Sequence, residues 1–330
     1  MRGNRGVGST TVTTEAGLPP VLAIAGPTAT GKSAFALALV ERLEGLAEII
    51  SVDSAQIYRG MDIGSAKPDA ATRAQVPHHL LDILDPVAAY SAARFAEDAR
   101  AAIVAIRARG RVPILVGGTM LYFRALFEGL SVLPRSDPAV RAELAAEAAR
   151  DGGESQHARL AMLDAETAAR LHPNDAQRVQ RALEIHTLSG EPASRWYARP
   201  KAGHGIDGRI VRFALQPPER ASLDLHIAVR FRRMLDDGFV DEVAGLHARG
   251  DLHLGLPSMR AVGYRQIWRH LDGDCGLAEA EKLAIIATRQ YAKRQMTWLR
   301  GDASWRWLDA TEPLASARVL NEIAAAPTSR

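Results

Sequence analysis

The 330-residue sequence contains one cysteine, Cys275, and no long apolar run. One thiol excludes an internal disulfide and any zinc site built on several cysteines, which favours a cytoplasmic protein. No segment approaches the roughly 18 apolar residues of a membrane span, so we expect no membrane partner. Lysine is scarce, with five among 41 basic side chains, and the net formal charge is only +3. Bulk charge therefore gives no argument for a nucleic-acid partner, and only local clusters can.

The N-terminal residues lack the apolar core of a signal peptide. Their Arg, Ser and Thr content is compatible with a transit peptide, but we interpret residues 1–18 as a disordered tail. The rest has the ordinary composition of a soluble protein, with 47% hydrophobic and 24% charged residues overall. Its length suffices for one large α/β domain with an insertion, or for two domains.

Residues 26–33 read Gly-Pro-Thr-Ala-Thr-Gly-Lys-Ser, a complete G-x-x-x-x-G-K-S phosphate loop. The apolar segment 21–25 before it predicts a buried strand, and 34–43 after it is rich in helix formers. This context argues against a chance glycine-rich turn. Backbone N–H groups and the helix N-terminus would face an anion. The expected phosphate-binding residues are Gly26, Pro27, Thr28, Ala29, Thr30, Gly31, Lys32 and Ser33, with the Ser33 hydroxyl as a ligand for Mg²⁺.

Strand and helix signals alternate through the first 130 residues, with strands expected at 48–52 and 111–116 and a helix at 92–109. This βαβ pattern predicts a doubly wound parallel sheet. Ligands of such sheets gather at the carboxyl ends of the strands. We therefore expect the phosphate loop, Asp53 and the segment 117–119 to share one crevice.

From residue 136 to 200 the pattern is helical only, with helices expected at 137–150, 156–171 and 176–189. Strand character returns at 210–215, followed by helices that include 226–237 and 278–299. We predict an α/β fold with a P-loop NTPase-like parallel sheet flanked by helices. Residues 19–135 and 201–330 would form this core, and 136–200 an all-helical insertion domain.

Asp53 is the most informative carboxylate, because it follows a strand beside the phosphate loop. An Asp there can hold Mg²⁺ or take a proton from an acceptor, although an N-cap of the next helix is an alternative. Thr28 and Thr119 would add hydroxyl donors. The adjacent His78 and His79 suggest a metal only weakly, because their side chains point apart and no third ligand is nearby.

Three clusters of cations lie at 177–181, 260–265 and 293–300. The last two include an aromatic residue, Tyr264 and Trp298 respectively. Cations interleaved with aromatics bind phosphates and splayed bases of single-stranded RNA. The alternative for each cluster is a solvated helix face or a helix cap.

Several further segments, in order, resemble the tRNA dimethylallyltransferase (tRNA isopentenyltransferase) family, in its bacterial form. Besides the phosphate loop they are SVDSAQIYRGMDIGSAKP at 51–68, PHHLLDI at 77–83, YSAARF at 90–95, VGGTMLYFRALFEGL at 116–130, LHPNDAQRVQRALEI at 171–185, LPSMRAVGYRQIW at 256–268 and ATRQYAKRQMTWLRG at 287–301. The resemblance covers about residues 19–309. The tail has no counterpart in the family, and the C-terminal zinc finger of some eukaryotic members is lacking.

This resemblance implies transfer of a dimethylallyl group from its diphosphate to the exocyclic amine of an adenine. That adenine lies 3′-adjacent to the anticodon in tRNAs that read codons beginning with U. The implied catalytic residues are Asp53 as proton acceptor, with Thr28, Lys32 and Arg230 at the diphosphate. The implied partner is the tRNA anticodon stem-loop, clasped by the helical insertion, and a monomer without protein partners is expected. The implied tRNA contacts are Asp53, Ser54, Ala55, Gln56, Thr119, Arg141, Gln177, Arg178, Val179, Gln180, Arg181, Arg260, Ala261, Val262, Gly263, Tyr264, Arg265, Lys293, Arg294, Gln295, Met296, Thr297, Trp298, Leu299 and Arg300.

Two other enzyme classes would use the same phosphate loop. An adenylate isopentenyltransferase would act on free AMP, ADP or ATP, but it would need neither the helical insertion nor the three clusters. A small-molecule kinase would need an arginine-rich lid, and the insertion, with 8 basic and 10 acidic side chains, is too weakly basic to be one. A non-catalytic RNA-binding module is disfavoured by the intact Gly31, Lys32, Ser33 and Asp53.

Overall fold

The computed structural model describes residues 17–199, 201–202, 205–217 and 219–325, which form two compact units. One unit combines the chain up to Phe127 with the chain from Ile206 onward, and the other is Glu128–Gly205. Most of the expected tail, residues 1–16, lies outside the described residues. No helix in the described ranges combines the length and apolarity needed for a membrane span.

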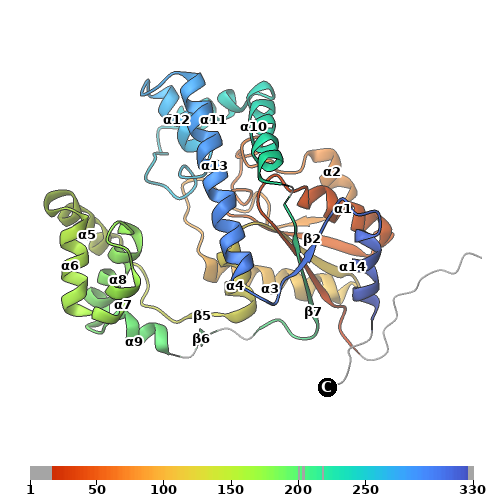
Figure 1. Ribbon diagram of the computed structural model, residues 1–330, viewed down its shortest axis with the longest axis horizontal. Coiled ribbons are helices and arrows are strands. Elements are labelled where there is room, and N and C mark those ends of the chain that lie inside the picture. Colours follow the sequence, from red (N-terminus) through yellow and green to blue (C-terminus); the bar gives the residue numbers. More distant parts are fainter. Residues whose placement is uncertain (1–16, 200, 203–204, 218, 326–330) are drawn as a thin grey trace, which may run out of the picture. The chain divides into compact units, whose positions relative to one another are not determined.

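The larger unit is built on a six-stranded sheet in the order β3-β2-β4-β1-β7-β8, with every neighbouring pair parallel (Figure 1). Its strands are β1 (Val21–Ala25), β2 (Ala47–Val52), β3 (His78–His79), β4 (Val112–Gly117), β7 (Ile210–Leu215) and β8 (Arg306–Leu308). β1, β2 and β4 are buried along their whole length, as expected for parallel strands covered on both faces. The predicted fold class is confirmed.

Helices cover both faces of this sheet (Figure 1). On one face, α1 (Lys32–Arg42) and α14 (Ala315–Ala324) pack against alternate residues of the strands. α3 (Ala92–Ala108) contacts β2 and β4 on the other face and is capped by the Ser91 hydroxyl, which accepts from the Arg94 amide at 3.1 Å. α4 (Met120–Glu128) follows β4 directly, and α2 (Ala70–Gln75) follows the long loop after β2.

A second core lies among four helices of the same unit, α10 (Arg220–Asp236), α11 (Phe239–His247), α12 (Tyr264–Leu271) and α13 (Leu277–Arg300). α13 confirms the helix expected at 278–299, and α10 starts six residues before the helix expected at 226. Ile57, Tyr58 and Met61, from the loop after β2, are buried in this core. The loop that follows Asp53 is therefore fixed by the C-terminal helices.

The smaller unit contains α5 (Pro138–Asp151), α6 (Gly153–Leu163), α7 (Ala165–Arg170), α8 (Ala176–Ser189) and α9 (Ala193–Ala198), with a short antiparallel pair of β5 (Leu130–Ser131) and β6 (Lys201–Ala202). The single helix expected over 156–171 was wrong, because it is interrupted at Asp164. The Asp164 carboxylate accepts from the Thr167 amide at 3.0 Å and from the Ser194 amide at 2.8 Å. A buried aspartate with these partners caps a new helix rather than continuing the old one.

Candidate active site

The phosphate loop connects β1 to α1, as its sequence predicts. Gly31 is the N-cap of α1 with a φ of 77°, a left-handed conformation that favours glycine. The Pro27 carbonyl accepts from the Thr30 hydroxyl at 2.8 Å and from the Lys32 ammonium at 2.7 Å. The lysine side chain thus folds back over its own loop and holds its charge where a phosphate would lie.

Two cations meet at this loop. The Arg230 guanidinium, from α10, donates to the Thr28 hydroxyl at 3.3 Å. Burial, with a contribution from the Arg230 charge, lowers the pKa of Lys32 from 10.5 to about 7. Burial also lowers the pKa of Arg230, and the Asp53 carboxylate opposes both shifts. The pocket is therefore electrostatically suited to an anion that would stabilise both charges.

The turn after β4 approaches the phosphate loop because it is made of glycine. A Cβ on Gly117 would lie 2.1 Å from the Val52 carbonyl oxygen, and one on Gly118 would lie 2.1 Å from the Gln295 amide nitrogen. Gln295 is buried, accepts from the Thr28 amide at 2.9 Å and donates to the Gly118 carbonyl at 2.8 Å. It therefore clamps the phosphate loop to the end of β4, a role that the sequence did not reveal.

Asp53 directly follows β2, beside these groups. Its Oδ1 accepts from the Ala55 amide at 2.8 Å and the Gln56 amide at 3.3 Å, and the Ser54 amide donates to the Thr119 hydroxyl at 3.2 Å. The alternative of an N-cap is wrong, because the next helix begins only at Ala70. Both hydrogen bonds use Oδ1, so Oδ2 remains available to a substrate.

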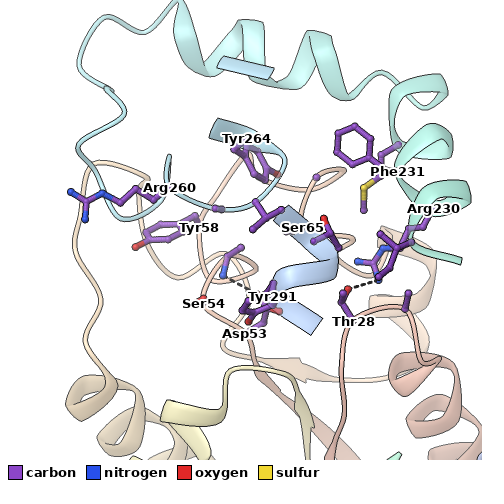
Figure 2. Close-up of a pocket in the computed structure, with 18 of the residues that line it drawn as sticks. Thr28, Asp53, Ser54, Tyr58, Ser65, Arg230, Phe231, Arg260, Tyr264 and Tyr291 are labelled. Atoms are coloured by element: carbon purple, nitrogen blue, oxygen red, sulfur yellow. Dashed lines mark hydrogen bonds between the residues drawn. The ribbon is translucent and has the colours of Figure 1, made fainter. Parts of the chain in front are cut away.

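Two hollows join at this point. The smaller, about 110 Å³, is lined by Lys32, Ser33 and the Gly117–Gly118 turn. The larger, about 440 Å³, is lined mostly by aromatic and apolar side chains (Figure 2). The residues that line both are Thr28, Asp53, Arg230 and Tyr291. An anion-binding hollow thus opens into an apolar cavity, with the candidate base at the boundary.

Tyrosines dominate the wall of the larger cavity: Tyr58, Tyr90, Tyr122, Tyr264 and Tyr291. Burial raises the pKa of each one, so all stay protonated at neutral pH. They come from five separate parts of the chain, and for this reason no local pattern in the sequence groups them. The nearest signal was on α13, where Tyr291 and Gln295 lie one turn apart on the same face.

Glu242, in the first turn of α11, fixes part of this wall. Its carboxylate accepts from the amides of Asp62, Ile63 and Gly64 at 2.6–3.2 Å, and from the Tyr264 hydroxyl at 2.6 Å. A Cβ on Gly64 would lie 2.1 Å from the Phe239 ring, so only glycine fits there. No local sequence signal marks Glu242, because the backbone groups that it binds lie 178 to 180 residues away.

The smaller hollow contains oxygen donors suited to a magnesium ion. Ser33 and Asp53 both line the smaller hollow, and their hydroxyl and carboxylate are the hard oxygen ligands that Mg²⁺ takes. No group of three or more His, Cys, Asp or Glu suited to a metal occurs among the described residues. His79 instead contacts the buried Glu48, Nε2 to Oε2 at 2.6 Å.

The residues expected to contact RNA divide by exposure. Those with buried side chains, which face the interior, are Val179, Tyr264, Gln295, Met296 and Leu299. Those that are exposed include Ser54, Arg260, Arg265, Lys293, Arg294, Thr297, Trp298 and Arg300 in the larger unit and Arg141, Gln177 and Arg178 in the smaller unit. A contiguous cluster in the sequence therefore supplies both core residues and surface cations, as helical periodicity requires.

Arg181 has a structural role in the smaller unit. Its guanidinium lies 2.7 Å from the Glu184 carboxylate, which is fully buried and also accepts from the Ser136 hydroxyl. Arg141 lies 3.9 Å from the same carboxylate, whereas Arg178 pairs with Asp175 and is 67% exposed. Arg181 therefore neutralises a buried charge, and the contact of these three arginines with RNA stays a prediction.

Comparisons with known proteins agree with this geometry. The chain is 59% identical over 282 residues to the tRNA dimethylallyltransferase of Halorhodospira halophila, covering 86% of this chain and 90% of that protein. It is 56% identical to the enzyme of the same name from Bordetella petrii, covering 92% and 97% of the two chains. The family model for IPP transferase matches residues 56–302.

Solved structures with a similar fold have similar names. The tRNA isopentenylpyrophosphate transferase of Bacillus halodurans superposes with a TM-score of 0.66 at 38% identity, covering 93% of this chain and 96% of that one. A eukaryotic dimethylallyltransferase acting on tRNA has a TM-score of 0.71 at 26% identity, covering 91% and 77%. The chain described here belongs to the IPP transferase family.

Proposed function

We propose that this protein transfers a dimethylallyl group from dimethylallyl diphosphate to the exocyclic amine of the adenine 3′-adjacent to the anticodon, in tRNAs that read codons beginning with U. The observation that carries the proposal is the junction of the two hollows at Asp53. A diphosphate ester needs a cationic hollow for its leaving group and an apolar space for its hydrocarbon. A base taken out of its stack needs an aromatic-lined pocket.

The residues divide the reaction between them. Lys32, Arg230 and the loop amides stabilise the negative charge that grows on the diphosphate as the allylic C–O bond breaks. The adenine amine supplies the electron pair for the new N–C bond, and its proton passes to Asp53 Oδ2. Because an aryl amine is a weak nucleophile, its orientation beside the allylic carbon contributes as much as proton removal.

Mg²⁺, held by the Ser33 hydroxyl and the diphosphate, would add positive charge at the leaving group and leave Asp53 Oδ2 to the adenine amine. The Thr28 hydroxyl is fixed by Arg230 at the boundary of the two hollows, where it can donate to a phosphate oxygen. The loop then serves diphosphate rather than the γ-phosphate of ATP, although an ATP-binding role is what the motif alone indicates.

The exposed cations and Trp298 are proposed to bind the tRNA anticodon stem-loop. In the larger unit they lie on α13 and around Arg260, which also lines the larger cavity. The smaller unit, proposed as the clasp for the stem-loop, contributes Arg178 and Arg141. We further propose a cytoplasmic monomer, because its substrate is tRNA and each required group occurs within one chain.

The test is transfer of labelled dimethylallyl diphosphate, with Mg²⁺, to unmodified tRNA with an A-rich anticodon loop, compared with AMP and ATP. Asp53→Asn is the informative variant, because an amide oxygen can still accept from the Ala55 and Gln56 amides but the side chain cannot take a proton. We expect label on tRNA only, and a rate about 10²- to 10⁴-fold lower in the variant.

Other outcomes would change the conclusion. Label on free nucleotide would indicate an adenylate isopentenyltransferase, and loss of the γ-phosphate from ATP would indicate a kinase. Full activity of Asp53→Asn would remove Asp53 from the role of proton acceptor while leaving the transferase activity itself in place.

A further inference from the structure

Tyr291 is the tyrosine of α13 that lines both hollows together with Asp53 (Figure 2). Burial and the nearby Asp53 carboxylate raise the pKa of Tyr291 to about 12, while the side chains of Thr119 and Gln295 next to its hydroxyl act in the opposite direction. The phenol therefore remains a hydrogen-bond donor at any pH used for an assay. Its position beside the candidate base gives it access to the same edge of a bound adenine.

Two other tyrosines of the cavity wall donate their hydroxyl protons to carboxylates outside the boundary of the two hollows. The Tyr90 hydroxyl donates to the Asp98 carboxylate at 2.7 Å, and the Tyr264 hydroxyl donates to Glu242 at 2.6 Å. The Thr119 hydroxyl already accepts from the Ser54 amide at 3.2 Å. Tyr291 thus combines proximity to Asp53 with a place at the boundary where the reaction is proposed to occur.

Adenine presents two groups side by side on its Watson–Crick edge: the amine donor that reacts and the N1 acceptor. A protein that reads this edge needs an acceptor next to a donor, and Asp53 and Tyr291 form such a pair. Guanine presents the reverse, with its O6 acceptor facing the carboxylate and its N1–H donor facing the phenol. Unpaired or repelled polar groups in a buried site give strong discrimination.

We propose that the Tyr291 hydroxyl donates a hydrogen bond to N1 of the target adenine while Asp53 accepts from its amine, so that the pair both orients the nucleophile and selects adenine. This inference rests on the proposed transferase function and extends it by naming the group that recognises the base. Flipped bases are commonly read through this edge by a few hydrogen bonds within an aromatic pocket.

The experiment compares Tyr291→Phe with the unaltered protein on three RNA hairpins that carry adenine, 1-deazaadenine or 7-deazaadenine at the target position. All three keep the exocyclic amine, and only the second lacks N1. We expect Tyr291→Phe to lower kcat/KM about tenfold on adenine and 7-deazaadenine, the size expected for one lost hydrogen bond, and to have no effect on 1-deazaadenine.

Tyr122→Phe is the matched variant, because it removes a second phenol oxygen from the same cavity. Its effect should be the same on all three hairpins. Thermal unfolding of Tyr291→Phe should match that of the unaltered protein within a few degrees, which shows that the fold is intact.

Three outcomes would overturn the inference: an equal loss on all hairpins, a loss that disappears with 7-deazaadenine instead, or an N1-dependent loss in Tyr122→Phe. Failure of the proposed function gives a different result, because the unaltered protein would then transfer no label to the adenine hairpin.

Discussion

Gln295 is predicted to be the residue on which the geometry of the phosphate loop depends most. Gln295→Met keeps the length and volume of the side chain but removes its amide group, both the acceptor oxygen and the donor nitrogen. The partly buried Thr28 amide and the buried Gly118 carbonyl then lose their partners at 2.9 and 2.8 Å. Each unsatisfied group costs about 1–3 kcal/mol, so the larger unit should lose about 2–4 kcal/mol of its free energy of unfolding.

For a unit of this size, that loss corresponds to a melting temperature lower by roughly 5–15 °C. The same substitution should weaken diphosphate binding, because the released Thr28 also carries the hydroxyl that accepts a hydrogen bond from Arg230. We expect KM for dimethylallyl diphosphate to rise about tenfold, with a smaller effect on KM for RNA.

The assay is thermal unfolding together with steady-state transfer kinetics. Gln290→Met is the control, because Gln290 lies on the same helix with its side chain exposed, and it should match the unaltered protein in both measurements. If Gln295→Met melts within about 1 °C of the unaltered protein and keeps its KM for the diphosphate, the reasoning about the clamp is wrong.

Three further predictions address charged groups. The pKa of Lys32 is about 7 in the protein without ligand, and a bound diphosphate favours the charged lysine. Above pH 7, Kd for dimethylallyl diphosphate should therefore rise up to tenfold for each pH unit. Above pH 7, calorimetry should show that the unaltered protein takes up a proton when it binds the diphosphate and that Lys32→Arg does not. An equal proton uptake by the two proteins would contradict this prediction. Hydrogen bonds from Arg109 lower the pKa of Glu48 from 4.5 to about 2, so its stabilisation is full above pH 4.5 and lost as the pH falls toward 2. Glu48→Gln should therefore be less stable by about 2 kcal/mol at pH 7, and a difference undiminished in unfolding curves at pH 3 would count against this. Arg181→Ala should destabilise the smaller unit by about 3 kcal/mol. Arg178→Ala, at an exposed position, should leave the melting temperature unchanged and lower the affinity for RNA. The reverse pattern in melting and RNA-binding assays would refute this assignment of a structural role to Arg181 and an RNA-binding role to Arg178.

Local sequence determined the fold class and the phosphate loop. The motif lies between a continuous apolar run and a helix-forming segment, and this order is typical of a buried parallel strand followed by a phosphate loop and a helix. Gly31 permits the left-handed backbone conformation that the loop requires. The position of Asp53 at the carboxyl end of β2 followed from the same rule of parallel sheets. The RNA contacts, the stem-loop clasp and the catalytic roles remain predictions.

Long-range packing decided what the sequence did not reveal. Gln295 meets Thr28 across 267 residues, and Glu242 meets the loop at 62–64 across about 180. Within the cluster 293–300, only the rotation of α13 decides which side chains enter the interior and which face solvent. Hydrophobic periodicity alone predicts that one helix continues through Asp164. The helix ends there instead, and the partner that helps to fix the Asp164 carboxylate, Ser194, lies 30 residues away and is not visible in the local sequence.

The sequence by itself therefore determined the phosphate loop and predicted the class of ligand, because a phosphate loop is one contiguous backbone segment. Tertiary structure alone decided the second half of the site, the cavity of tyrosines that meets the phosphate loop at Asp53 and Tyr291. The physical reason is that a pocket wall is made of side chains from many elements, and their convergence depends on how the helices pack rather than on any local pattern.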